Sequence, residues 1–146
     1  MPASHPELDL DAQLRVAVGR LNRRIRAEKA SDDLSDGQFS VLALLFREGP
    51  HTVGQLAEAE RVTPPSMNRR VNALEEGGYV AREGSPDDGR KVVVRLTGDG
   101  AAFVTETRRR RDQWLAKRTR ELTDAQRETL LAASVIMRAL ADSAES

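Results

Sequence analysis

Apolar residues recur every three to four positions along most of the chain, which is the spacing that places them on one face of a helix. The first such stretch covers residues 8–29. The second begins after Ser35, because Gln38 follows three residues later and completes a capping box. This second helix should run to Gly49, and its apolar positions are expected to continue the core: Phe39, Leu42, Leu45 and Phe46.

Two short helices separated by a tight turn are predicted between residues 52 and 78. Thr52 and Gln55 form another capping box, which starts the first of them. Thr63 is the N-cap candidate of the second, and the proline pair 64–65 fits its first turn, where a missing amide hydrogen costs little. The second helix should stop at the glycine pair 77–78, since glycine readily adopts the left-handed conformation at a helix C-terminus.

The second of these short helices has two different faces. At about 100° per residue, Met67, Val71 and Leu74 point to one side. The other side carries Pro65, Arg69, Asn72 and Glu76, with Ser66 and Asn68 on its flanks, so its N-terminal half is short, polar and uncharged apart from the arginine. Such residues allow close approach to DNA and can bond base edges in a major groove. An ordinary solvated helix face has the same composition, so this stripe alone leaves both interpretations open.

A short β-hairpin is predicted after this helix. Its strands cover residues 79–83 and 90–96, and the connection between them is rich in turn residues. A helix-turn-helix followed by such a hairpin is a winged helix. Arg90, near the tip, suits the narrow minor groove of A·T-rich DNA. Alternatively, Arg90 pairs with Asp87 or Asp88 on the surface, and the two roles are compatible because a carboxylate can aim the arginine.

These motifs, in this order, resemble the MarR (multiple antibiotic resistance regulator) family of bacterial transcription factors. The most specific part is Asp88-Gly89-Arg90 followed by Val94-Arg95-Leu96-Thr97, and the resemblance extends from about Leu8 to Leu140. It implies a mainly α fold with a small β-hairpin wing, in which a winged helix-turn-helix is flanked by N- and C-terminal dimerisation helices.

The resemblance also implies an organisation and a set of DNA contacts. We expect a single domain over residues 1–146, with a DNA-binding lobe at 35–96 and dimerisation helices at 8–29 and 98–141. The residues expected to contact DNA are Thr63, Pro65, Ser66, Asn68, Arg69, Arg70, Asn72, Asp88, Arg90 and Lys91. The proline pair departs from the family's contacts, because it removes two amide donors that could bond phosphate.

The C-terminal part predicts two more helices. The first is capped by Thr97 and runs to about Arg120, and its basic run 108–111 wraps around the helix, so we expect a solvated or phosphate-flanking face without base contacts. The second follows a capping box at Thr123 and is too apolar around its circumference for a helix on a small monomer. A dimer interface follows, with these candidate residues: Leu10, Leu14, Leu21, Leu131, Val135, Ile136 and Leu140.

Composition narrows the function classes. The chain has 146 residues, of which 23 are basic and 23 acidic, so its formal net charge is zero. Evidence for nucleic-acid binding must therefore come from where the charges lie and not from their sum. The chain has no cysteine, which excludes disulfides and thiolate metal sites. Its first residues do not have the basic-then-apolar form of a signal peptide, and no apolar run approaches 18 residues. We therefore expect a cytoplasmic protein without a membrane partner. The basic helix 8–29 could lie on a membrane, but it lacks anchoring aromatics, which favours a partner helix.

The functional hypothesis is a homodimeric repressor of transcription that binds a palindromic operator in double-stranded DNA. We expect no enzymatic activity, because the only histidines, His5 and His51, have no catalytic partner at a recognisable spacing. No metal and no resident cofactor are expected. The family implies a possible small aromatic or phenolic effector, for which Arg23, Arg24 and Arg47 are weak candidates. The rival hypothesis is a winged helix that binds only proteins, which would place apolar residues on the exposed helix face.

Overall fold

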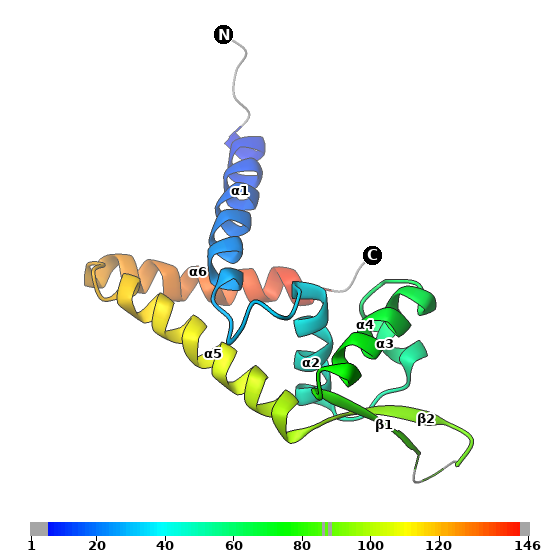
Figure 1. Cartoon of the computed structure of the whole chain (residues 1–146). Coiled ribbons are helices and arrows are strands. Elements are labelled where there is room, and N and C mark those ends of the chain that lie inside the picture. Colours follow the sequence, from blue (N-terminus) through cyan, green and yellow to red (C-terminus); the bar gives the residue numbers. More distant parts are fainter. Residues whose placement is uncertain (1–5, 86, 88, 144–146) are drawn as a thin grey trace. The chain divides into compact units, whose positions relative to one another are not determined.

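The computed structural model describes residues 6–85, 87 and 89–143, which form six helices and one two-stranded sheet (Figure 1). The elements are α1 (Pro6–Ala27), α2 (Asp36–Glu48), α3 (Val53–Ala59), α4 (Pro64–Glu76), β1 (Val80–Gly84), β2 (Val92–Leu96), α5 (Gly98–Thr119) and α6 (Asp124–Asp142). The predicted mainly α fold with a β-hairpin wing is confirmed. The chain divides into two compact units, residues 1–111 and 112–146, and the boundary falls within α5.

Capping residues start the helices where the sequence places them. Ser35 Oγ accepts a hydrogen bond from Gln38 N at 3.1 Å, and Gln38 Oε1 accepts one from Ser35 N at 2.8 Å. The same reciprocal pair forms at Thr52 before α3 and at Thr123 before α6. Each such cap stabilises its helix by about 1 kcal/mol. Helix α1 begins and ends two residues earlier than predicted, at Pro6 and Ala27.

The two strands pair in antiparallel register from Val80 opposite Leu96 to Gly84 opposite Val92. Strand β2 starts two residues later than predicted, because residues 89–90 form part of the turn. His51 adds a short bridge on the other edge of β2, where Val94 N donates to His51 O at 2.7 Å. The hairpin is therefore tied to the connection between α2 and α3 as well as to α4.

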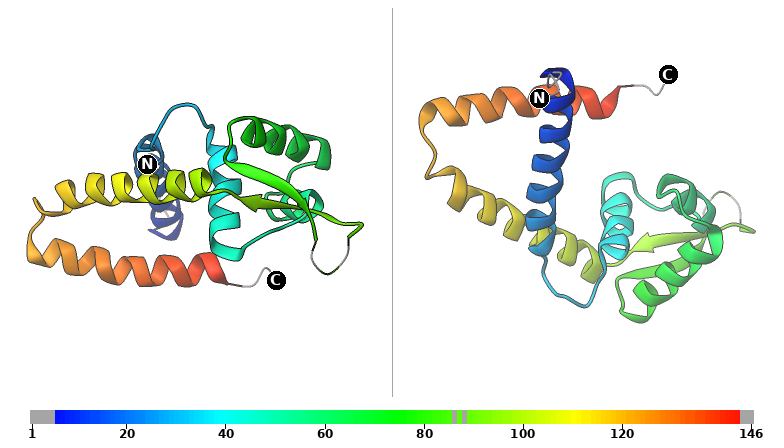
Figure 2. Two further views of the ribbon diagram at one scale, coloured as in Figure 1. Left: turned by 60° about the horizontal axis from the view of Figure 1, so that its bottom comes forward. Right: turned by 90° about the horizontal axis from the view of Figure 1, so that it is seen from above.

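The core of the first unit lies among α2, α3, α4, the hairpin and the start of α5. Figure 2 shows α2, α3, α4 and the hairpin gathered into one lobe, from which α1 leaves as a separate helix. Val41, Leu42, Leu56, Met67 and Val94 are fully buried in it. Two aromatic contacts with Phe103 extend the core into α5, from Phe39 (ring centroids 6.2 Å apart) and from Tyr79 (5.4 Å).

The expectation that Phe46 belongs to the core is wrong, since its side chain is 41% exposed. The buried face of α2 is centred on Leu45 and includes Val41 and Leu44, whereas Phe46 lies about 100° away from that centre. Phe39 lies on the same edge of the helix but is covered by Phe103. Phe46 is instead covered in part by the guanidinium of Arg108, 4.8 Å from its ring centroid.

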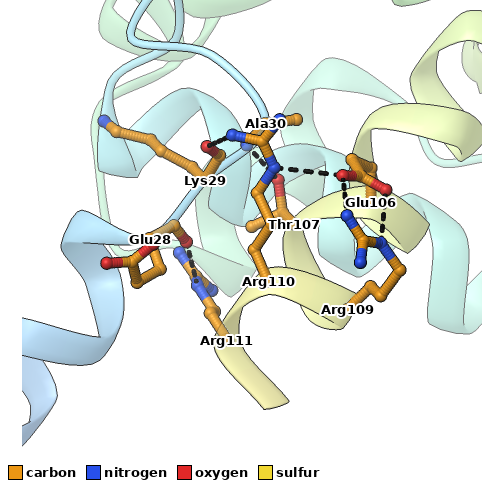
Figure 3. Close-up of polar contacts among 8 residues, drawn as sticks. All are labelled: Glu28, Lys29, Ala30, Glu106, Thr107, Arg109, Arg110 and Arg111. Carbon is orange, nitrogen blue, oxygen red and sulfur yellow. Dashed lines mark hydrogen bonds and ion pairs between the residues drawn. The ribbon is translucent and has the colours of Figure 1, made fainter. Parts of the chain in front are cut away.

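The basic run of α5 is only in part the solvated or phosphate-flanking face expected of it. Arg111 Nε donates to the carbonyl oxygen of Glu28 at 3.0 Å, and Arg110 Nη1 donates to that of Lys29 at 3.1 Å (Figure 3). Arg109 and Arg110 both bond the carboxylate of Glu106. Two of the four arginines therefore bind the backbone that connects α1 to α2, a contact that no spacing along the sequence indicates.

The second unit holds the end of α5 and the whole of α6. Arg127 Nε donates to Thr119 O at 2.9 Å across the turn between the two helices. Within its described residues α6 has no buried side chain, and several of its large apolar residues are more than half exposed: Leu130, Leu131, Val135, Ile136 and Leu140. No helix in the described part of the chain is long and apolar enough to cross a membrane.

Candidate nucleic-acid interface

Helix α4 begins as the sequence predicts. Thr63 has extended backbone angles, and its side chain accepts a hydrogen bond from Ser66 N at 3.3 Å. Pro64 and Pro65 occupy the first two helical positions, and Met67 N donates to Thr63 O at 3.0 Å. The first turn of α4 thus has two missing amide hydrogens and two that are already bonded, which leaves none to bind phosphate.

The turn before α4 contains a feature that the sequence did not reveal. Arg61 has a φ of +53°, the only described non-glycine residue with a positive φ. Residues other than glycine, asparagine and aspartate rarely adopt this backbone conformation. The sharp end of α3 at Arg61 therefore carries a conformational cost. The turn is closed by Val62 N, which donates to Ala57 O at 3.0 Å. An arginine carries no turn signal, which is why composition could not identify this position.

The two faces of α4 separate as predicted. Met67, Val71 and Leu74 are completely buried. The opposite side exposes four of the predicted contact residues, with a fifth half-buried beside them: Pro65, Asn68, Arg69 and Asn72, with Ser66. The structure therefore brings these five onto one outward surface without a large apolar side chain among them.

Arg70 is a predicted DNA-contact residue that the structure places elsewhere. Its side chain is half-buried and lies against the first turn of α2, where Nη1 is 3.5 Å from Gly37 O. A β-carbon added at Gly37 would come within 2.8 Å of Arg70 Cζ, which shows how closely the guanidinium covers that turn. Arg70 contacts α2 and does not join the outward surface of α4.

Hydroxyl groups link three of the outward residues. Thr63 Oγ1 donates to Ser66 Oγ at 3.0 Å, and Arg69 Nη2 donates to the same oxygen at 3.2 Å. Because Ser66 Oγ accepts both bonds, its own hydrogen remains available to an acceptor such as a phosphate oxygen or a purine N7. These bonds also hold Arg69 along the helix and lower the entropy that it would lose on binding.

The wing is tied to α4 by Arg82, a residue that sequence reasoning missed. Arg82 Nη1 donates to Glu75 Oε1 at 3.0 Å, and its backbone N donates to Glu75 Oε2 at 3.2 Å. Its other terminal nitrogen, Nη2, donates to Asn68 Oδ1 at 3.4 Å. Arg82 thereby orients the amide of Asn68 so that the NH2 group faces away from the wing. This contact depends on the packing of β1 beside α4.

The wing presents two predicted cations and leaves one predicted residue unassigned. Arg90 and Lys91, which directly precede β2, are exposed. Asp88 lies outside the described residues. Ser85 N donates to Lys91 O at 2.8 Å, which closes the loop. At the base of the hairpin, Arg95 Nε donates to Glu83 Oε2 at 3.0 Å.

Comparisons with known proteins agree with this geometry. The model of the MarR family matches residues 34–92, which include α2, α3, α4 and β1 and end at the first residue of β2. The HTH-type transcriptional regulator Mb0904 of Mycobacterium bovis is 42% identical over 139 residues, which cover 92% of this chain and 97% of that protein. The chain belongs to the MarR family. It is therefore a winged helix-turn-helix transcriptional regulator, as the motifs around Asp88-Gly89-Arg90 indicated.

Two further relatives extend the MarR-family comparison. A crystal structure of a transcriptional regulator protein from Pseudomonas aeruginosa PA01 has a TM-score of 0.85 and 31% identity, and the match covers 97% of this chain and all of that one. The HTH-type transcriptional repressor YetL of Bacillus subtilis is 31% identical over 89 residues, which cover 60% of this chain and 53% of that protein. The similarity thus includes the helices on both sides of the winged helix.

Proposed function

We propose that this MarR-family regulator is a homodimeric repressor that occupies a palindromic operator in double-stranded DNA. The observation that carries the proposal is the outward surface of α4, which is polar and ordered by hydrogen bonds, next to the exposed cations of the wing. Ser66, Asn68, Arg69 and Asn72 suit base edges in the major groove, and Arg90 and Lys91 suit the minor groove and its phosphates. Repression is supported by the name of the repressor YetL, to which part of the chain is similar.

Dimerisation is supported by apolar side chains that the single chain leaves uncovered. Leu10 and Leu21 on α1 are 65% and 50% exposed, and Leu131 and Ile136 on α6 are 69% and 61% exposed. Leu14, also predicted for the interface, is half-buried. Large apolar side chains exposed in number on one helix favour an interaction site there. A two-fold dimer requires an operator of matching two-fold symmetry. The centres of its half-sites should lie about 34 Å apart, which is one helical turn of B-DNA.

Release by a small aromatic or phenolic effector completes the proposal. The structure offers a cavity of about 460 Å³ beside Arg23, Arg26 and Lys29, and the first of these was a candidate for binding a carboxylate. Its volume is within the range of small-molecule sites. Asp36 also lines it, so the cavity combines three cations with one carboxylate. An aromatic acid is the class of ligand that this charge balance favours.

The test is the affinity of the full chain for its own promoter DNA, compared with a scrambled duplex over a series of salt concentrations. Arg69→Ala and Arg90→Ala should each weaken promoter binding about tenfold, since one good contact to a base or phosphate is worth about 1–3 kcal/mol. Arg47→Ala, an exposed arginine at the end of α2, is the matched control and should bind as the wild type does. Equal and weak binding of both duplexes, for this promoter and in a genome-wide selection, would favour the protein-binding alternative.

A further inference from the structure

The chain leaves α1 at Ala27 with three consecutive backbone groups held by side chains of α5. Arg111 Nε donates to Glu28 O at 3.0 Å, and Arg110 Nη1 donates to Lys29 O at 3.1 Å. Ala30 N donates to Thr107 Oγ1 at 3.0 Å. Carbonyl groups at and beyond a helix C-terminus lack intrahelical donors, and here a second helix supplies them. We call this set of contacts the α1–α5 joint; Figure 3 shows its members.

The side chains of the α1–α5 joint are themselves held in place. Thr107 is completely buried. Arg110 Nε bonds Glu106 Oε1 at 3.0 Å, which aims the other end of its guanidinium at Lys29. The guanidinium of Arg111 lies 4.5 Å from the ring centroid of Phe39 in α2, and burial lowers its pKa. Restrained side chains of this kind lose little entropy when they bond the backbone, so the joint is stiff.

The spacing explains how one helix turn makes the whole contact. Thr107, Arg110 and Arg111 stand at i, i+3 and i+4 on α5, so they share a face. That face meets the α1–α2 connection and, through Phe39, the core of the winged-helix lobe. The joint therefore fixes the direction of α1 relative to the lobe that carries α4.

We infer that Thr107, Arg110 and Arg111 are positioning residues that set the half-site spacing accepted by the protein. The inference rests on the proposed dimer, in which α1 contributes to the interface. Leu10 is 17 residues from Ala27, or about 26 Å along a helix at 1.5 Å per residue. A rotation of about 10° at the joint would move Leu10 by roughly 4.5 Å, more than the ~3.4 Å rise of one base pair. A loose joint would therefore make the distance between the two copies of α4 in the dimer variable.

The basic run supplies its own control. Arg109 bonds Glu106 at 2.7 and 2.9 Å, and within the described part of the chain it does not bond the α1–α2 connection. Arg109→Ala therefore removes one cation from the same run and keeps the three contacts of the joint. Thr107→Val keeps the shape of the buried side chain and removes only the acceptor of Ala30 N. Thr107→Ser keeps the acceptor and should restore the wild-type behaviour. These two variants remain informative if an arginine variant folds poorly.

The first measurement is the distribution of distances between α1 and the lobe. The chain has no cysteine, so spin labels can be placed at Ala12→Cys in α1 and Glu58→Cys in α3, both at exposed positions. Doubly labelled chains are diluted into excess unlabelled chain, so that distances within one chain dominate. Thr107→Val, Arg110→Ala and Arg111→Ala should broaden the distribution, whereas Arg109→Ala and Thr107→Ser should match the wild type. Equal widths in all variants would overturn the inference.

The second measurement is affinity for operators whose half-sites are moved apart or together by one and two base pairs. The wild type and Arg109→Ala should lose about tenfold or more at each step, and the joint variants should lose several-fold less. If the arginine variants instead weaken binding equally at every spacing, with a smaller salt dependence, the arginines are phosphate contacts and the inference is wrong. A wild type that binds no operator would count against the proposed function, while the distance measurement still tests the joint.

Discussion

Gly100 is buried in the first turn of α5, where this helix packs against Tyr79, between α4 and β1, and against Leu96 at the end of β2. A β-carbon added there would overlap the carbonyl oxygen of Tyr79 and would lie 2.6 Å from Leu96 Cδ1. The Tyr79 oxygen cannot move away freely, because Thr97 N donates to it at 3.1 Å. Gly100→Ala therefore requires the backbone of α5 to shift relative to the hairpin.

The expected cost follows from two opposing effects. Overpacking of a close contact destabilises by about 1–3 kcal/mol. Alanine in place of glycine in a compatible helical position stabilises by about 0.4–1 kcal/mol. Gly98→Ala offers the second effect alone, since a β-carbon at Gly98 would meet no atom within 4 Å. The same substitution two residues apart should thus change stability in opposite directions.

The assay is urea unfolding followed by circular dichroism, with all proteins at one concentration because a dimer's stability depends on concentration. Gly100→Ala should unfold at lower urea than the wild type and Gly98→Ala at slightly higher urea. The two should differ by about 1–3 kcal/mol, the cost of overpacking alone, because both variants share the gain from replacing glycine by alanine. If Gly100→Ala is as stable as Gly98→Ala, the close approach of α5 to Tyr79 is not a packing constraint and the reasoning fails.

Three further predictions concern the wing, a surface carboxylate and the dimer. Arg82→Ala should release the amide of Asn68, so a selection from randomised operators should yield a different preferred base at the position that Asn68 contacts. Arg95→Ala, at the base of the wing, should leave that preference unchanged. Hydrogen bonds from two arginines lower the pKa of Glu106 to about 2 from its usual 4.5. The ionised carboxylate therefore stabilises the fold fully above the pKa of the unfolded chain, and this stabilisation is lost as pH falls toward 2. The melting temperatures of Glu106→Gln and the wild type should converge over that range. A difference that stays constant would contradict the lowered pKa of Glu106. Leu131→Lys should give a monomer by light scattering, because this side chain is 69% exposed in the single chain and a buried lysine would oppose association; an unchanged dimer mass would place the interface elsewhere.

Local signals in the sequence were enough to predict most helix starts. Ser35 and Thr52 start their helices through capping boxes, and Thr63 with the prolines starts α4, because a cap depends only on residues within one turn. The separation of buried Met67 from exposed Asn68 also followed, since helical phase is a local property. The outward surface of α4 was therefore predictable in its main members.

Contacts between elements were the part that the sequence could not reveal. Phe46 has the spacing of a core residue, but what covers each edge of α2 depends on where α5 docks. Arg110 and Arg111 bind backbone carbonyls, which every residue possesses, so no partner type marks the α1–α2 connection. Arg70 was assigned to DNA by analogy, whereas its position against α2 depends on the packing of two helices.

The paired prolines at the start of α4 have a consequence for hydrogen-exchange experiments. The first turn of a helix normally contains several amides that exchange quickly because they lack acceptors. In α4 two of those positions have no amide hydrogen, and the amides of Ser66 and Met67 are bonded to Thr63. Deuterium uptake at the N-terminus of α4 should therefore be low before any DNA is added. Protection of amides by bound DNA would therefore have to be sought in the wing and not in this turn.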